Sequence, residues 1–135
     1  MCTLRVIGTE FDVDAFLATS PLVPSSVFRK GEARRPARDP DGPKHERSAV
    51  CIAVSDAEWS DLPAQVSDAE RFLISNREAI EALAALPGIE DLLLDFPIEL
   101  RADGIKLAAQ TDRFPASLVR LSGSLGLGLA LTLYS

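Results

Sequence analysis

The residues best suited to chemistry form one basic stretch, Phe28-Arg29-Lys30-Gly31-Glu32-Ala33-Arg34-Arg35-Pro36. Cations beside a glycine on a loop tip are well placed to meet carboxylates or phosphates. The alternative interpretation is a solvated loop whose charges only keep the protein soluble. The stretch predicts these candidate partner-binding or anion-binding residues: Arg29, Lys30, Gly31, Glu32, Arg34 and Arg35.

The basic stretch lies within an acidic chain. Of 135 residues, 20 are acids and 14 are bases, which gives a formal charge of −6 and a pI of about 4.7. Residues 29–47 nevertheless hold seven of the bases and four of the acids, so their local charge is +3 and that of the remainder is −9. A net acidic surface repels phosphate backbones, so nucleic acid is not an expected partner.

Residue types that commonly catalyse reactions are isolated in this chain. His45 is the only histidine and lies within residues 29–47. Cys2 and Cys51 belong to no metal-binding cluster, so we expect two free, buried thiols. Paired acids such as Asp12 and Asp14 are better explained as helix caps or turns. We therefore expect no catalytic, metal or cofactor site, although the sequence does not exclude an enzyme.

Trp59, the only tryptophan, follows an apolar run at residues 48–55. A single tryptophan after a buried strand is typical of a lid over the core. The second interpretation is a binding anchor, because tryptophan is common at interaction hot spots.

Hydrophobic periodicity predicts the elements that must position these residues. In the first half we expect strands at residues 2–8, 25–30 and 48–55, and a short helix capped by Asp12 or Asp14. Between 32 and 46 no core-forming residue exceeds alanine in size, so this basic, proline-rich segment is predicted to be a loop, with flexibility a second possibility.

In the second half a long helix is predicted between Leu62 and Leu86. It would begin at Pro63 or at a capping box from Ser67 to Glu70. Strict alternation at residues 92–100 predicts a half-exposed strand. Pro97 within it indicates either an edge position in the sheet or a bulge in the strand. A short strand at 105–109, a helix opened by Pro115 and a leucine-rich strand at 125–134 complete the chain.

This order predicts a single α+β domain over residues 1–135. We expect a ferredoxin-like β-α-β-β-α-β core with a mainly antiparallel sheet, helices on one face, and a C-terminal helix and strand as an extension. No signal peptide or sufficiently long apolar segment is apparent, so we expect a cytoplasmic protein without membrane association. A homodimer joined through a sheet edge or an exposed leucine face is compatible with the pattern.

Several of these segments together resemble a known family. Asp12-Val13-Asp14-Ala15-Phe16-Leu17, the turn to Phe28-Arg29-Lys30-Gly31-Glu32, and Phe114-Pro115-Ala116-Ser117-Leu118 before a leucine-glycine strand are similar to the bacterial family labelled domain of unknown function 4279. The resemblance covers most of the chain and implies an intracellular α+β protein with no established activity. Some members resemble acidic immunity proteins that neutralise toxins.

Two functional hypotheses follow from the sequence. The first is a non-catalytic protein-binding module of immunity or adaptor type, whose partner would be a toxin or a complex subunit. The second is a binder or enzyme for a small anionic ligand, with the arginines and lysine of the basic stretch as the anion clamp.

Overall fold

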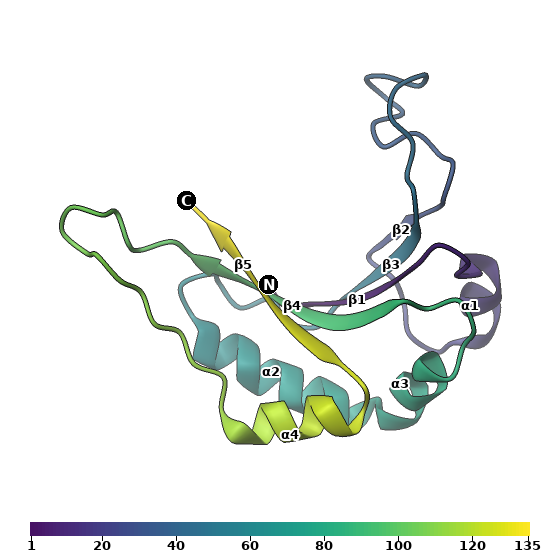
Figure 1. Ribbon diagram of the computed structural model, residues 1–135. Coiled ribbons are helices and arrows are strands. Elements are labelled where there is room, and N and C mark those ends of the chain that lie inside the picture. Colours follow the sequence, from purple (N-terminus) through teal and green to yellow (C-terminus); the bar gives the residue numbers. More distant parts are fainter.

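The computed structural model describes residues 1–135 and has an α+β architecture (Figure 1). Most helices lie below a curved sheet in this view, and a long segment projects above it. The strands and helices, in chain order, are β1 Thr3–Gly8, α1 Val13–Thr19, β2 Ser26–Phe28, β3 Ser48–Ala53, α2 Leu62–Ser75, α3 Arg77–Ala84, β4 Asp91–Glu99, α4 Ala116–Ser124 and β5 Gly128–Tyr134.

The five strands form one sheet in the order β2-β3-β1-β4-β5. The pairs β2–β3, β3–β1 and β1–β4 are antiparallel, and β4–β5 is parallel. The predicted α+β class and mainly antiparallel sheet are therefore confirmed. The complete order differs from that of a four-stranded ferredoxin-like sheet, because β5 lies beside β4 as an additional parallel strand.

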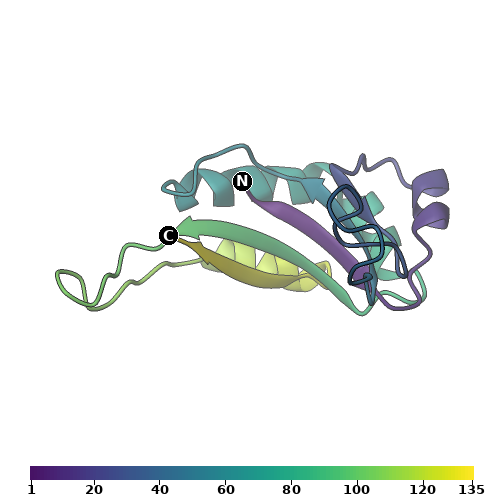
Figure 2. The ribbon, with the colours of Figure 1, turned by 90° about the horizontal axis from the view of Figure 1, so that it is seen from above.

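A single hydrophobic core fills the space between the helices and one face of the sheet. Leu4, Val50, Ile52, Leu94 and Phe96 alternate along their strands and point into it. Buried residues from all four helices join the same cluster. The sheet's other face bears no helix and lies open between the projecting segment and the end of the chain (Figures 1 and 2).

Local capping explains where α1 and α2 begin, and the structure corrects the prediction of one long helix. Asp12 caps α1 through a 3.0 Å bond from the Ala15 N–H. Asp61 caps α2 in the same way, so the helix begins at Leu62 with Pro63 in its first turn, and the capping box at Ser67 is not used. The predicted long helix is in fact two, because Asn76 leaves helical geometry between α2 and α3.

Strand β4 is central, so its predicted edge position is wrong. It pairs with β1 on one side and with β5 on the other. Its pairing with β1 ends at Thr3 and Asp95, so Pro97 faces no strand on that side, and its missing N–H removes no ladder bond. Proline is tolerated here because the neighbouring strand is shorter.

Two further predictions are corrected in the last third of the chain. No strand forms at 105–109; residues 100–115 are a long connection from β4 to α4. The last strand begins at Gly128, since Leu125 and Leu127 are buried in the turn before it. None of the helices has both the length and the apolar character needed to cross a bilayer.

Candidate functional site

The predicted basic loop takes the form of a hairpin that extends β2 and β3. We call residues 29–47 the basic arm. Its two sides are joined by backbone bonds of 2.9 Å from the Gly31 N–H to the His45 carbonyl, from the His45 N–H to the Glu32 carbonyl, and from the Arg34 N–H to the Pro43 carbonyl. Gly31 has a φ of 86°, a conformation that favours glycine. The arm rises away from the sheet, above its open face (Figure 1).

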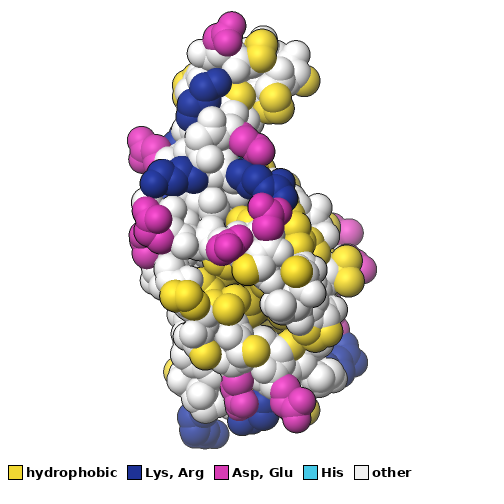
Figure 3. Space-filling model, turned by 90° about the vertical axis from the view of Figure 1, so that its right-hand side faces the viewer, with side chains coloured by type: hydrophobic (Ala, Val, Ile, Leu, Met, Phe, Trp, Pro, Cys, Tyr) yellow, Lys and Arg dark blue, Asp and Glu magenta, His cyan; other side chains and the backbone are white.

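The base of the arm is held to the body by ion pairs. Arg29 lies 2.9 Å from Asp14, and this hydrogen bond raises the pKa of its guanidinium. Lys30 approaches Glu10 at 3.6 Å, and Arg47 approaches Asp91 at 3.2 Å. Opposite charges alternate where the arm leaves the body (Figure 3). Two of the predicted binding residues, Arg29 and Lys30, therefore already have carboxylate partners.

The tip of the arm contains arginines that form no ion pair. Arg34, Arg35 and Arg38 line a hollow of about 340 Å³ together with Asp39 and Pro43. None of the three is among the residues that form salt bridges, although Arg34 Nε donates to the Lys44 carbonyl at 3.2 Å. We call this group the arginine hollow.

The other predicted residues of the stretch lie outside the hollow. Gly31 and Glu32 form the neck of the arm through their backbone groups, and Glu32 makes no ion pair. Arg38 was not among the predicted binding residues. No local signal in the sequence marks it: a backbone turn at residues 35–39, with bonds from the Arg38 and Asp39 N–H groups to the Arg35 carbonyl, returns it to Arg34 and Arg35.

A second concave region lies on the open face of the sheet, at the opposite end of the strands. Its pocket of about 370 Å³ is walled by Arg5, Asp95, Trp59 and Tyr134, among others. Arg5 Nη2 lies 2.6 Å from Asp95 Oδ2, and Thr132 Oγ1 donates to Asp95 Oδ1 at 2.6 Å. We call this region the sheet pocket.

Trp59 belongs to the rim of the sheet pocket and is not a lid over the core. It is 41% exposed, and its ring stacks on Tyr134 with a centroid separation of 4.7 Å and an interplanar angle of 22°. The Trp59 carbonyl accepts a bond from the Glu99 N–H at 3.3 Å. The structure does not bring Trp59 to the basic residues, which lie beyond the other end of the sheet.

The histidine and the two cysteines lie apart from one another. His45 packs against Phe28 at 5.0 Å between ring centroids. Cys2 is buried, and burial raises its thiol pKa to about 12, so at neutral pH it is no nucleophile. Cys51 is only half-buried, contrary to expectation. No group of three or more histidine, cysteine or acidic side chains is placed to hold a metal ion.

The chain matches no family model, no curated protein and no solved structure.

Proposed function

We propose that the protein is a non-catalytic protein-binding module of immunity or adaptor type, which binds an acidic surface of its partner through the arginine hollow. The observation that supports this proposal most directly is the convergence of Arg34, Arg35 and Arg38 without carboxylate partners. Guanidinium groups bind carboxylates in two-point geometry, and backbone bonds between the two sides of the arm hold these three groups near one another.

The charge distribution supports a macromolecular partner. The arm has a charge of +3, whereas the rest of the chain has −9. An acidic partner would be repelled by the body and attracted to the arm, so the field would orient the two molecules before contact. The ion pairs of Arg29 and Lys30 fix the arm's base and leave the tip free to bind.

The second candidate is a small anionic ligand held in the same hollow. Its concave shape and volume of about 340 Å³ favour this alternative. However, pockets for small molecules are mostly lined by apolar and aromatic side chains. Here the lining is three arginines, Asp39 and Pro43, so a polar protein surface fits better.

We also infer that the first four strands form a ferredoxin-like core of a bacterial, cytoplasmic protein. Two features support the core. Strand β3 lies between β1 and β2, which α1 connects, and β1 lies between β3 and β4, which α2 and α3 connect. These are two interlocked split β-α-β units, the arrangement expected of that core. Bacterial origin rests on the family resemblance.

Polyglutamate and tripolyphosphate are suitable probes for the two candidates. The wild type should bind polyglutamate, and the triple variant Arg34→Ala, Arg35→Ala and Arg38→Ala should bind it at least about tenfold more weakly by calorimetry, equivalent to about 1.4 kcal/mol. The control variant removes three exposed arginines outside the arm, Arg77, Arg113 and Arg120, and should keep its affinity.

The two probes separate the hypotheses. Tight tripolyphosphate binding with no polyglutamate binding would replace the protein partner by a small anion. Binding of neither probe, together with failure of photo-crosslinkers at the arm tip to join any protein of the source cells in a 1:1 complex, would contradict both. Equal losses in the triple variant and in its control would show that only overall charge matters.

A further inference from the structure

The outer edge of β5 is the one long sheet edge of the molecule without a neighbour. β5 is last in the sheet and spans seven residues, whereas the opposite edge strand, β2, has only three. In Figure 1, β5 crosses the front of the molecule, and Figure 2 shows β4 along one side of β5 and no strand along the other. Natural proteins usually protect such an edge.

The direction of the backbone groups on β5 follows from one hydrogen bond. The Tyr134 carbonyl accepts from the Leu100 N–H at 2.7 Å, so Tyr134 directs its backbone groups toward β4. Because these directions alternate along a strand, Thr132 and Ala130 also bond toward β4. Leu129, Leu131 and Leu133 therefore present their N–H and carbonyl groups outward, and no loop bonds to them.

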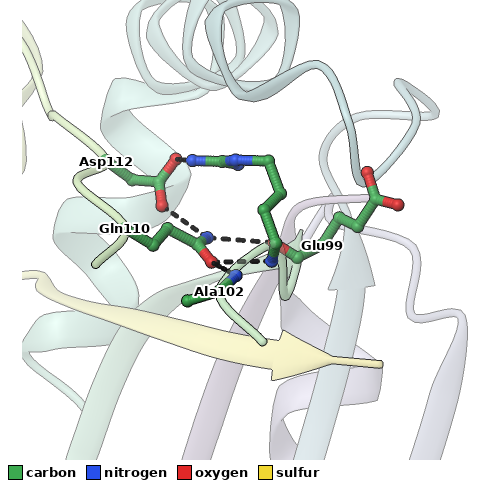
Figure 4. A network of polar contacts seen from close by, with 5 residues as sticks. Glu99, Ala102, Gln110 and Asp112 are labelled. Atoms are coloured by element: carbon green, nitrogen blue, oxygen red, sulfur yellow. Dashed lines mark hydrogen bonds and ion pairs between the residues drawn. The ribbon is translucent and has the colours of Figure 1, made fainter. Parts of the chain in front are cut away.

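The connection that follows β4 leaves this edge open. Its hydrogen bonds to β5 are limited to the Leu100–Tyr134 contact. Gln110 instead closes the neck of the connection on itself: its Nε2 donates to the Glu99 carbonyl at 2.9 Å and to Asp112 at 2.8 Å, and its Oε1 accepts from Arg101 (Figure 4).

The strand that forms this edge carries no charge of its own. Residues 121–135 contain no charged residue. Leu131 and Leu133 are 43% and 56% exposed and, with Ile98 and Leu100, form the apolar side of a hollow of about 400 Å³. Its polar side is Gln110, Thr111 and Asp112. Many edge strands carry charged residues or a proline, which prevent another strand from pairing with them. β5 has neither.

We infer that β5 pairs antiparallel with β5 of a second copy of this chain. A two-fold axis at Leu131 places Leu131 opposite itself and Leu129 opposite Leu133 of the other copy. The two-fold axis repeats the Leu129–Leu133 pair, so there are three pairs in all. Each pair joins residues with outward backbone groups and makes two hydrogen bonds, which gives about six. Leucines from both copies then lie on one continuous face.

The neutrality and the two-fold register of this edge fit a second copy of the chain. Each chain has a net charge of −6, so two copies repel each other through most of their surfaces. The β5 edge is the long, neutral, self-complementary surface at which like chains can meet without opposing charges. The pairing does not involve the basic arm and is independent of the proposed function.

The oligomeric state tests this inference. The wild type should sediment as a dimer at micromolar to millimolar concentration, with the amides of Leu129, Leu131 and Leu133 protected from hydrogen exchange only in the dimer. Leu131→Pro removes an outward N–H and keeps the β4 ladder, so it should give a folded monomer. Leu131→Lys places like charges at the axis and should do the same.

Ile74→Lys is the matched control, since Ile74 is exposed on α2, away from the edge. It should remain dimeric, and circular dichroism should show that all three variants are folded. A wild type that is monomeric at millimolar concentration would overturn the inference. So would a dimer that persists in both Leu131 variants.

Discussion

Arg5 and Asp95 form an ion pair of unequal burial across β1 and β4. The Arg5 side chain is 42% exposed and that of Asp95 only 6%, and their charged atoms are 2.6 Å apart. Asp95 also accepts the Thr132 hydroxyl, so this carboxylate joins three adjacent strands, β1, β4 and β5. Removing its cation would leave a nearly buried charge with a single neutral donor.

Arg5→Met should therefore lower the free energy of unfolding by about 1–3 kcal/mol, the usual penalty for an unsatisfied buried group. Asp95→Asn in the Arg5→Met background should recover part of the loss, because the stranded charge is removed. Urea unfolding of the two single variants and the double variant measures the coupling. Arg77→Met, which breaks an exposed pair with Glu81, should cost less than about 0.5 kcal/mol. Additive losses at Arg5 and Asp95 would contradict the coupling.

The two cysteines should differ in reactivity. Cys2 is 1% exposed and burial raises its pKa to about 12, whereas Cys51 is half-buried on the open face. At pH 8 a disulfide reagent such as dithionitrobenzoate should label one thiol per native chain quickly. Cys51→Ser should abolish that fast phase, and the Cys2 thiol should react only at the rate of unfolding. Fast labelling in Cys51→Ser would show that Cys2 is accessible.

Stability should fall in acid because four carboxylates have lowered pKa values: Asp68, Glu90, Asp103 and Asp112. Bonds from Thr9, and then Arg47, hold the pKa of Glu90 below its ordinary 4.5, and bonds from Gln110 and Arg101 hold that of Asp112 below 3.8. The folded protein thus binds these protons less readily than the unfolded chain. The stabilisation is complete above the ordinary values and is lost as pH falls through the lowered ones.

Urea unfolding between pH 7 and pH 3 measures this loss. The double variant Glu90→Gln and Asp112→Asn should show a weaker dependence on pH below about 4.5 than the wild type. Glu46→Gln is the control, since Glu46 is exposed and makes no ion pair. A double variant with the wild-type pH profile would show that these two groups do not contribute.

The stack of Trp59 on Tyr134 makes the sheet pocket observable by fluorescence. Tyr134→Ala should expose the indole, shift its emission to longer wavelength and increase quenching by iodide. Tyr134→Phe keeps a stacking ring and should resemble the wild type. Because Trp59 is the only tryptophan, the signal has a single origin. An unchanged spectrum in Tyr134→Ala would mean that the stack does not shield Trp59 in solution.

Periodicity in the sequence predicted most strands, since side chains alternate between core and open face. It could not predict the place of β4 in the sheet. Pro97 suggested an edge strand because proline has no N–H to donate to a neighbouring strand. That β1 is too short to reach Pro97 is a property of the tertiary structure, which local sequence does not show. Periodicity also missed the interruption of the predicted long helix at Asn76, because buried apolar residues continue on both sides of it, at Leu73 and Ile80.

The sequence predicted where the candidate site lies better than it predicted which residues form it. The cluster of bases identified the arm, but Arg29 and Lys30 meet Asp14 and Glu10, which are distant in sequence. Such pairings depend on how α1 packs beside the hairpin, which local sequence does not encode. Arg38 joins Arg34 and Arg35 through a backbone turn that the spacing alone does not specify.

The hairpin geometry of the arm has an evolutionary consequence. Residues 32–46 add nothing to the hydrophobic core, and their backbone bonds are made within the arm itself. Lengthening a surface segment of this kind costs little free energy. The arm can therefore change in length and sequence while the body keeps its stability, which makes it the part of the protein most free to diversify and a natural position for grafting a foreign peptide.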